Sequence, residues 1–320
     1  MTAVVPPASG SNAASEPTSR VTIGILALQG AFAEHSAWLS KLGADVREVR
    51  LPHEFEGLDG IVLPGGESTA MALIGERWGV FPRLKQWVSE GRPVWGTCAG
   101  MILLSDHALM QKKGGQSLVG GLNIEVCRNY FGAQKSSFEV PLDTSVLGLD
   151  ADDKKVAEAT KPTPYPAVFI RAPAVLEVGA GVDVLCKVRA RPCAKAVSVM
   201  RTQLQDGNDD AQNGGGEEEG DAPRAKRRRL AAFFVESDSP PAAGASSSSR
   251  KEAPEVIVAI RKGNIVGTSF HPELTNDSRW HEYFVRIVKE AVAASGEKSG
   301  DGKKIATTPA AAASAASDEA

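Results

Sequence analysis

The chain has 320 residues, of which 42% are hydrophobic and 23% are charged, and its formal net charge is −3. This composition is typical of a globular protein with one large domain or two small ones. The slightly acidic balance gives no electrostatic reason to expect a nucleic acid or an anionic membrane surface as a partner. No run of about 18 apolar residues occurs, so a membrane-spanning helix is not expected.

The cysteines and the first residues bear on the location of the protein. Four cysteines occur without a CxxC pair, and a chain of this length does not need disulfide bonds to fold. Residues 1–19 are rich in Ala, Ser and Pro and lack the basic start of a secretory signal. We therefore expect a disordered tail over 1–19 and a reducing, cytoplasmic location. The basic run from Lys226 to Arg229 could act as a nuclear signal, although a solvated charge run is the more common explanation.

Strands alternate with helices in the first third of the chain. The predicted strands are 21–28, 44–50, 60–63 and 93–96, and the predicted helices are 31–42, about 68–74, 81–90 and a segment after residue 98. Ser68 or Thr69 can cap the second helix. In the first helix, one stripe carries Phe32, His35, Trp38, Leu39 and Leu42. This alternation predicts a three-layer α/β domain with a mostly parallel, flavodoxin-like central sheet.

More strands and longer loops follow. The later predicted strands are 122–127, 137–140, 167–170, 184–188, 196–200, 256–260 and 265–270. Residues 203–252 contain runs of Gly, Glu, Arg and Ser that cannot bury a core, which predicts a disordered insertion between neighbouring strands. A helix over 279–293 closes a domain that spans 20–293, and 294–320 reads as a disordered tail.

A cysteine lies between two glycines at a predicted strand-to-helix junction, Gly96-Thr97-Cys98-Ala99-Gly100. This G-x-C-x-G spacing is the thiol version of a nucleophile elbow, in which the glycines permit a strained turn. The N-terminus of the following helix would favour the thiolate, and the N–H group of Ala99 would point at a developing oxyanion. For this motif alone, a buried, inert cysteine is an equally good interpretation.

The segment His271-Pro272-Glu273 follows the last predicted strand. In an extended chain, residues two apart project to the same side, so Glu273 could orient His271 and His271 could take the proton of Cys98. A strand end with a capping acid explains this segment better when it is taken alone. Both motifs, however, stand at predicted carboxyl ends of strands, where open α/β sheets place their sites. Together they favour a catalytic triad.

The glycine pair Gly65-Gly66 follows the strand predicted at 60–63. Two glycines let the backbone approach a ligand closely, and their N–H groups can serve an oxyanion hole. A plain turn with a helix cap is the alternative. A phosphate-binding loop is not favoured, because the Walker spacing and its lysine are absent.

Other charged and imidazole side chains give weaker indications. Arg128 and Arg171 follow strand-like runs and could hold a carboxylate with two hydrogen bonds, although each alone reads more simply as a surface ion pair. His53, His107 and His281 show no metal-ligand spacing, so the sequence predicts no metal site.

These motifs resemble those of the glutaminase subunits of pyridoxal 5′-phosphate synthase, which are class I (triad) glutamine amidotransferases. G-x-C-x-G and His-x-Glu would fit any triad glutaminase, whereas Ala-Leu-Gln-Gly, Gly-Gly-Glu-Ser-Thr and Ile-Arg-Ala-Pro are much more specific to this subfamily. The resembling segments lie in the family's order between about residues 21 and 293. They are 24–35, 63–69, 96–101, 128–132, 169–173 and 269–275.

The resemblance implies that this chain hydrolyses L-glutamine to glutamate and ammonia without a cofactor, through a thioester on Cys98. His271 would then be the base and Glu273 its orienter. The residues that it implies for binding L-glutamine are Gly66, Glu67, Ser68, Arg128, Ile170 and Arg171. Those that it implies for the oxyanion hole are Gly65, Gly66 and Ala99.

The resemblance also implies a partner. Ammonia would pass to a synthase subunit that builds pyridoxal 5′-phosphate from a pentose phosphate and a triose phosphate, and residues 28–35 would face that subunit. Two alternatives remain, which are a triad glutaminase that serves another biosynthetic acceptor and a catalytically inactive homologue that acts as a binding module. The departure from compact members of the family is the insertion at 203–252, which interrupts none of the motifs.

Overall fold

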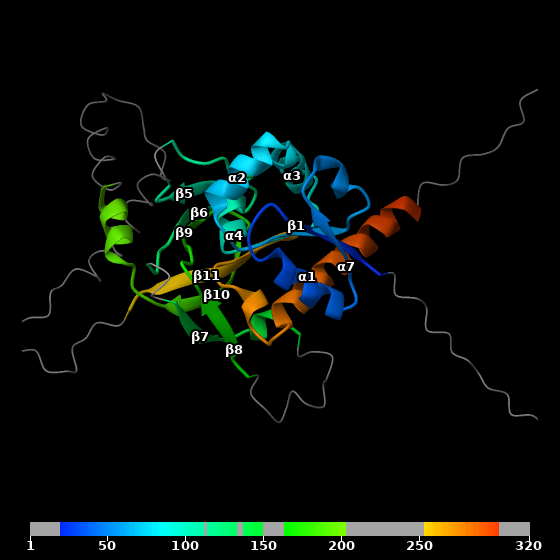
Figure 1. The fold of residues 1–320 in the computed structure, drawn as a ribbon. Coiled ribbons are helices and arrows are strands. Elements are labelled where there is room, and N and C mark those ends of the chain that lie inside the picture. The colour runs from blue at the N-terminus through cyan, green and yellow to red at the C-terminus, as the bar shows by residue number, and fades with distance from the viewer. Residues whose placement is uncertain (1–19, 112–113, 133–136, 150–162, 203–252, 301–320) are drawn as a thin grey trace, which may run out of the picture.

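The computed structural model of the chain describes residues 20–111, 114–132, 137–149, 163–202 and 253–300 (Figure 1). The disordered segments predicted at 1–19 and 203–252 and the end of the predicted C-terminal tail, 301–320, lie outside the described residues. Within the described part, no helix is both long enough and apolar enough to cross a membrane.

Five parallel strands form one half of the central sheet. They are β2 (Asp45–Val49), β1 (Thr22–Leu26), β3 (Gly60–Leu63), β4 (Val94–Thr97) and β12 (Ile265–Thr268), in that spatial order. Every residue of β3, β4 and β12 is buried, which explains why these strands read as continuous apolar runs rather than as an alternating pattern.

The other half of the sheet is largely antiparallel. Beyond β12 come β11 (Glu255–Lys262), β9 (Ala174–Val178), β6 (Ile124–Cys127) and β5 (His107–Leu109), and β10 (Asp183–Arg189) also pairs with β11. A separate two-stranded sheet joins β7 (Phe138–Leu142) to β8 (Tyr165–Phe169). The strands that flank the predicted insertion, β10 and β11, are therefore antiparallel neighbours.

Helices cover both faces of the parallel half (Figure 1). The helices α1 (Phe32–Lys41) and α7 (Arg279–Gly300) pack on one face, and α2 (Ser68–Arg77), α3 (Val80–Ser89) and α4 (Ala99–Leu104) pack on the other. Successive strand residues alternate between the two cores, since Val62 joins the first and both Ile61 and Leu63 join the second. The prediction of a three-layer α/β fold is confirmed.

Three local predictions differ from the structure. Residues 194–202 are helical, so the strand predicted at 196–200 is wrong. Four of these five residues are apolar, but Ala196 and Met200 are the fully buried ones, and a spacing of four places both on one face of a helix. The N-cap residue of α2 is Glu67 rather than Ser68 or Thr69, because the Glu67 carboxylate accepts hydrogen bonds from the N–H groups of Thr69 and Ala70. Finally, α7 continues to Gly300, beyond the predicted end at 293.

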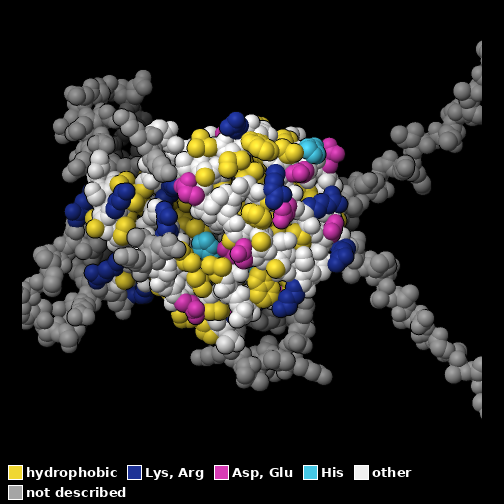
Figure 2. Space-filling model, in the orientation of Figure 1, with side chains coloured by type: hydrophobic (Ala, Val, Ile, Leu, Met, Phe, Trp, Pro, Cys, Tyr) yellow, Lys and Arg dark blue, Asp and Glu magenta, His cyan; other side chains and the backbone are white. Residues whose placement is uncertain are grey.

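Charges are spread over the visible surface rather than gathered into one basic face. Figure 2 shows Lys and Arg side chains intermixed with Asp and Glu over much of this side, with a histidine near the centre beside hydrophobic and acidic side chains. Such an arrangement gives no continuous track for a phosphate backbone on this side of the molecule.

Candidate active site

Cys98 stands on a sharp turn between β4 and α4. Its φ angle is +46°, a conformation that L-residues rarely adopt, and its side chain is buried. The two flanking glycines are needed sterically. A Cβ on Gly96 would stand 2.5 Å from the carbonyl carbon of Gly100, and a Cβ on Gly100 would overlap the carbonyl oxygen of Leu63 in β3. The G-x-C-x-G spacing therefore reflects close packing around a strained elbow.

The register of β4 against β12 brings the two sequence motifs together. Thr97 is the partner of Thr268 in the parallel pair, and the N–H of Cys98 extends the pairing by donating to the carbonyl oxygen of Thr268 at 2.8 Å. Cys98 thus follows the carboxyl end of β4, next to the carboxyl end of β12, from which the chain continues to His271. The turn after β3 completes the group, because a Cβ on Gly65 would lie 2.5 Å from Cε1 of His271 and 3.5 Å from Cβ of Cys98.

His271 and Glu273 form a short hydrogen bond. Nδ1 of His271 lies 2.7 Å from Oε1 of Glu273, and both side chains are buried. The contact was predicted, but the predicted cause is wrong. Pro272 to Leu274 form a single 3-10 turn, η6, rather than extended chain, and the carboxylate of Glu273 curls back to the ring across this turn. Proline suits this turn because its fixed φ and missing N–H fit the first position of a helix.

The surroundings of His271 and Glu273 shift the pKa values of both groups. Burial lowers the pKa of His271, but the neighbouring Cys98 and Glu273 outweigh burial and raise it to about 11. Burial opposes ionisation of Glu273 too, yet the facing His35 and His271 hold its pKa below the ordinary value. The site therefore favours a protonated imidazole ring that lies between the carboxylate of Glu273 and the sulfur of Cys98, as expected for the acid–base partner of a nucleophile.

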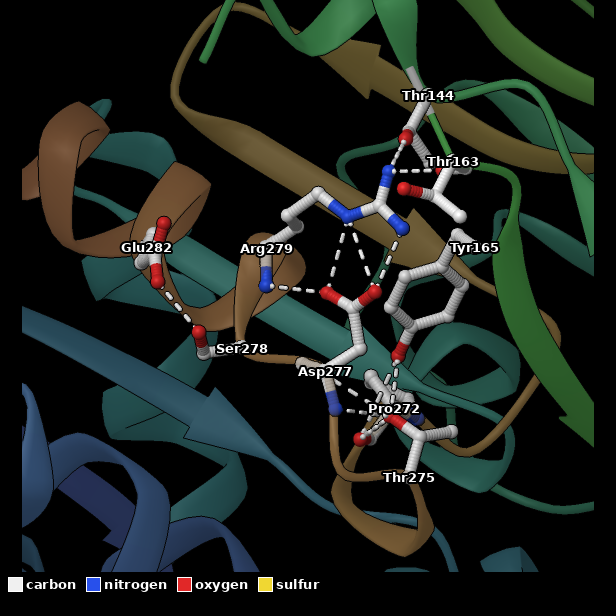
Figure 3. A network of polar contacts seen from close by, with 9 residues as sticks. All are labelled: Thr144, Thr163, Tyr165, Pro272, Thr275, Asp277, Ser278, Arg279 and Glu282. Atoms are coloured by element: carbon white, nitrogen blue, oxygen red, sulfur yellow. Dashed lines mark hydrogen bonds and ion pairs between the residues drawn. The ribbon is translucent and has the colours of Figure 1, made fainter. Parts of the chain in front are cut away.

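A network of polar contacts fixes the segment that carries Glu273 (Figure 3). The hydroxyl of Thr275 donates to the carbonyl oxygen of Pro272 at 3.1 Å and lies 3.0 Å from the hydroxyl of Tyr165 on β8. Farther along, Arg279 pairs with Asp277 and donates to Thr144 at 2.7 Å. These contacts join η6 to the β7–β8 region, so Glu273 rests on a rigid turn.

The residues predicted to bind L-glutamine lie around the Gly65-Gly66 turn and the ends of β6 and β8. Arg128 directly follows β6, is 8% exposed, and donates to Oε1 of Glu67 at 3.3 Å. The arginine is therefore buried, whereas its partner Glu67 is partly exposed, so this is a half-buried pair rather than the surface ion pair expected from the sequence. Ser68 is buried at the start of α2, and its hydroxyl donates to Oε1 of Gln116 at 3.1 Å.

Ile170 and Arg171 sit at the end of β8 next to the triad. The N–H of His271 donates to the carbonyl oxygen of Val168 at 2.9 Å, which ties the histidine to this strand. Arg171 is exposed and has a φ of +49°, and it is close enough to Arg128 that its charge lowers the pKa of Arg128. The two arginines follow different strands, β6 and β8, and each guanidinium can pair with a carboxylate.

Comparison with known proteins shows the family of the chain. Residues 25–204 and 238–290 match the SNO glutamine amidotransferase family. The chain belongs to this family. The unmatched stretch between the two segments, 205–237, falls inside the predicted insertion.

Named relatives agree with this assignment. The chain is 39% identical over 272 residues to the probable pyridoxal 5′-phosphate synthase subunit PDX2 of Arabidopsis thaliana, which covers 84% of this chain and 87% of the relative. It is 35% identical over 268 residues to the pyridoxal 5′-phosphate synthase subunit PdxT of Corynebacterium jeikeium, covering 84% and 97% of the two chains. A solved structure titled as a glutamine amidotransferase superposes with a TM-score of 0.54 at 28% identity, over 83% of this chain and 98% of that one.

Several residues around this glutamine amidotransferase site were not singled out from the sequence. Gln29 accepts from the N–H of Glu67 at 2.7 Å, and a Cβ on Gly66 would press on the same oxygen. Gln116 bonds both Ser68 and Thr69. Gln29 belongs to the Ala-Leu-Gln-Gly segment that carried the resemblance, whereas Gln116 lies in a loop without a recognisable pattern.

Two buried histidines near the site were not predicted as part of it. His35 was predicted only as a member of an apolar helix stripe, and His281 was noted only as lacking a metal-ligand spacing. Both are fully buried, and His35 faces Glu273 while His281 faces His35. Across the ranges that the structure describes, no group of three His, Cys, Asp or Glu side chains is arranged to hold a metal ion.

Proposed function

We propose that this protein hydrolyses L-glutamine to glutamate and ammonia, with Cys98 as nucleophile, His271 as acid and base and Glu273 as the residue that orients His271. The observation that carries this proposal is the convergence of the strained Cys98 elbow and the His271–Glu273 bond at the carboxyl ends of the adjacent strands β4 and β12. Membership of the SNO glutamine amidotransferase family supports it.

The first half of the reaction forms a thioester. The thiolate of Cys98 attacks the side-chain carboxamide carbon of L-glutamine and gives a tetrahedral oxyanion. The N–H groups of Ala99 and of the Gly65-Gly66 turn are the donors that we assign to this oxyanion. Protonated His271 then gives its proton to the leaving nitrogen, the C–N bond breaks, and ammonia departs.

The second half regenerates the thiolate. Neutral His271 takes a proton from a water molecule as that water attacks the glutamyl thioester. The second tetrahedral intermediate collapses, the C–S bond breaks, and glutamate leaves while the imidazolium–thiolate pair is restored. Glu273 keeps Nδ1 of His271 protonated throughout, so that Nε2 is the atom that exchanges protons with substrate. All these steps use side chains and water, so the scheme requires no cofactor.

The α-carboxylate and α-ammonium groups of L-glutamine would be held by the surrounding polar side chains. Arg128 and Arg171 suit the α-carboxylate of L-glutamine, and the Gly66–Glu67–Ser68 segment and Ile170 would border the substrate. Glu67 offers a carboxylate for the α-ammonium group, although it already caps α2 and pairs with Arg128.

The ammonia would be delivered to a synthase subunit that makes pyridoxal 5′-phosphate, in a hetero-oligomeric complex. Relatives named as subunits of pyridoxal 5′-phosphate synthase, identical at 35–39% over most of the chain, support this destination over another biosynthetic acceptor. The reducing cytoplasm would be the location of the complex, where the free Cys98 thiol persists.

The decisive test is a glutaminase assay on the full chain, alone and with the pyridoxal 5′-phosphate synthase subunit from the same source. We expect glutamate release that depends on Cys98 and increases when the synthase subunit is added. The Cys98→Ala variant should have no glutaminase activity and should unfold at the same temperature as the wild type.

The outcomes separate the alternatives. Activity retained by Cys98→Ala would overturn the catalytic assignment. Cys98-dependent activity that is unchanged by the synthase subunit, and increased by a different ammonia-using enzyme, would favour another acceptor. No activity and no covalent adduct with a glutamine-like chloroketone, even with the synthase present, would show an inactive homologue.

A further inference from the structure

The carboxylate of Glu273 has two oxygens, and only one of them contacts His271. Oε1 bonds the ring of His271 at 2.7 Å, whereas Oε2 faces Nε2 of His35 at 3.3 Å. Both His35 and the side chain of Glu273 are fully buried. Within the described residues, no other side chain pairs with Oε2, and an uncompensated carboxylate oxygen in a dry interior is costly.

His35 belongs to a chain of buried polar groups that crosses the layer between α1 and α7. Nδ1 of His35 lies 3.0 Å from Nε2 of His281 on α7, and Nε2 of His35 lies 3.2 Å from the hydroxyl of Thr97, the residue before the nucleophile. His35, His281 and Thr97 are all 0% exposed. The indole of Trp95 meets both imidazole rings edge to face, with ring centroids 5.4 and 5.0 Å apart, which limits their rotation.

One assignment of protons gives these buried polar groups matching donors and acceptors. Nε2–H of His281 donates to Nδ1 of His35, and Nε2–H of His35 is then available to the hydroxyl of Thr97 at 3.2 Å and to Oε2 of Glu273, which faces it at 3.3 Å. This leaves Nδ1 of His281, which has no hydrogen-bond partner among the described atoms, as an unprotonated acceptor. The reverse assignment would bury a donor there and point a lone pair of His35 at a carboxylate, so it is disfavoured.

Both histidines are neutral in this arrangement. Burial lowers the pKa of His35 and holds the pKa of His281 well below its ordinary value. The charged and titratable groups that act on His35 are Glu273 from η6, His271, His281 from α7 and Glu34 on its own helix. A neutral ring can still donate one N–H, which is what Oε2 of Glu273 requires.

We propose that His35 is a positioning residue: its Nε2–H holds the second oxygen of Glu273 so that the first stays on His271, and His281 fixes the tautomer of His35. His35 touches neither substrate nor nucleophile, and it acts through Glu273. The helices α1 and α7 are thereby coupled to the acid of the triad. The turnover part of this proposal rests on the proposed glutaminase function, whereas the geometric part does not.

The test exploits two side chains that each replace one half of an imidazole. In His35→Gln, the amide nitrogen can reach the place of Nε2 and donate to Glu273. In His35→Asn, the shorter amide reaches only the place of Nδ1 and can meet His281 but not Glu273. Both variants bury one polar amide, so their stabilities should be similar, and thermal unfolding checks this. His35→Leu removes both contacts.

The first readout is the rate of alkylation of Cys98 by iodoacetamide as a function of pH, with the modified residue identified by mass spectrometry. It reports the thiolate–imidazolium pair without any need for glutamine turnover. We expect His35→Gln to keep the wild-type profile within about threefold and His35→Asn to lose at least about tenfold in rate at neutral pH, the loss expected for one charge-assisted hydrogen bond. Equal profiles for the Gln and Asn variants, or a wild-type profile for a folded His35→Leu, would overturn the proposal.

The second readout is glutamine hydrolysis in the presence of the synthase subunit. His35→Asn should lower kcat and leave KM nearly unchanged, because Glu273 acts on the chemical steps rather than on binding. A change in KM alone would contradict a role through Glu273. If the wild type itself does not hydrolyse glutamine, the proposed function fails, while the alkylation contrast still decides whether His35 positions the triad.

Discussion

Nδ1 of His271 lies 2.7 Å from Oε1 of Glu273, although the two residues share one 3-10 turn and a single residue separates them. Residues outside this pair hold it in place. Tyr165 and Thr275 hold the turn on one side, and His35 faces the free carboxylate oxygen on the other. The carboxylate of Glu273 is thus held by elements from three separate parts of the chain.

Removing the charge of Glu273 without changing its shape should impair catalysis. We expect Glu273→Gln to lower kcat by about a hundredfold or more, because the amide can no longer stabilise the imidazolium and can select the wrong tautomer of His271. KM should change little. Steady-state glutaminase kinetics with the synthase subunit would check this, with the exposed Glu48→Gln as a control that keeps wild-type rates. Equal kcat values for the two variants would contradict the role of Glu273.

The raised pKa of His271, about 11, gives stability a defined pH dependence. A group whose pKa is higher in the folded than in the unfolded state stabilises the protein fully below its unfolded value, about 6.5, and this contribution is lost as the pH rises through the folded value. The advantage of the wild type over His271→Gln in free energy of unfolding should therefore decrease between about pH 6.5 and about pH 11. Urea unfolding of both proteins across this range measures it, and an advantage that grows with pH would contradict the assigned charge.

The elbow glycine Gly100 should not tolerate a methyl group. Its Cβ would overlap the carbonyl oxygen of Leu63, a backbone atom of the central sheet that cannot easily move. We expect Gly100→Ala to lower the free energy of unfolding by about 3 kcal/mol. Gly43→Ala is the matched control, since Gly43 has a φ of +84° but nothing near its Cβ position, and it should lose only about 1 kcal/mol. Equal losses in chemical denaturation would show that contact with Leu63 is not what excludes a side chain.

Arg128 should affect binding more than chemistry. Replacing it by lysine keeps the charge but removes the planar fork that can hold a carboxylate and Glu67 together. We expect Arg128→Lys to raise KM for L-glutamine about tenfold or more with a small effect on kcat. Arg47→Lys, which changes a half-exposed arginine paired with Asp45, should leave both constants unchanged. A fall in kcat at constant KM would place Arg128 with the chemistry instead.

The sequence predicted most of the parallel half of the sheet because its signals are local. Runs such as 60–63 and 93–96 are buried on both faces and end at glycine-containing motifs, so strand, turn and nucleophile could be placed together. The strands β5 and β9 were not predicted: β5 has only three residues, and β9 pairs with β6 and β11, which lie far from it along the chain. At 196–200, a mostly apolar run of five residues was too short to distinguish a strand from a helix.

The convergence of Cys98, His271 and Glu273 could be predicted from the sequence, whereas the contacts that support it could not. These three residues belong to recognisable motifs, G-x-C-x-G and His-x-Glu. His35 shows the period of an amphipathic helix and so looks like a residue of the apolar stripe, and its contact with Glu273 depends on how α1 docks beside η6. Gln29 and Gln116 likewise gain their partners only when the Glu67–Thr69 segment folds against them.

The pairing of β10 with β11 around the unmatched stretch 205–237 has a practical consequence. A chain divided within that stretch would place Cys98 on one polypeptide and His271 with Glu273 on the other. The second piece contains β12, which must insert between β4 of the first piece and its own β11 to restore the sheet. Ammonia release by the two co-expressed pieces would then serve as a reporter of fragment complementation, because neither half carries a complete triad.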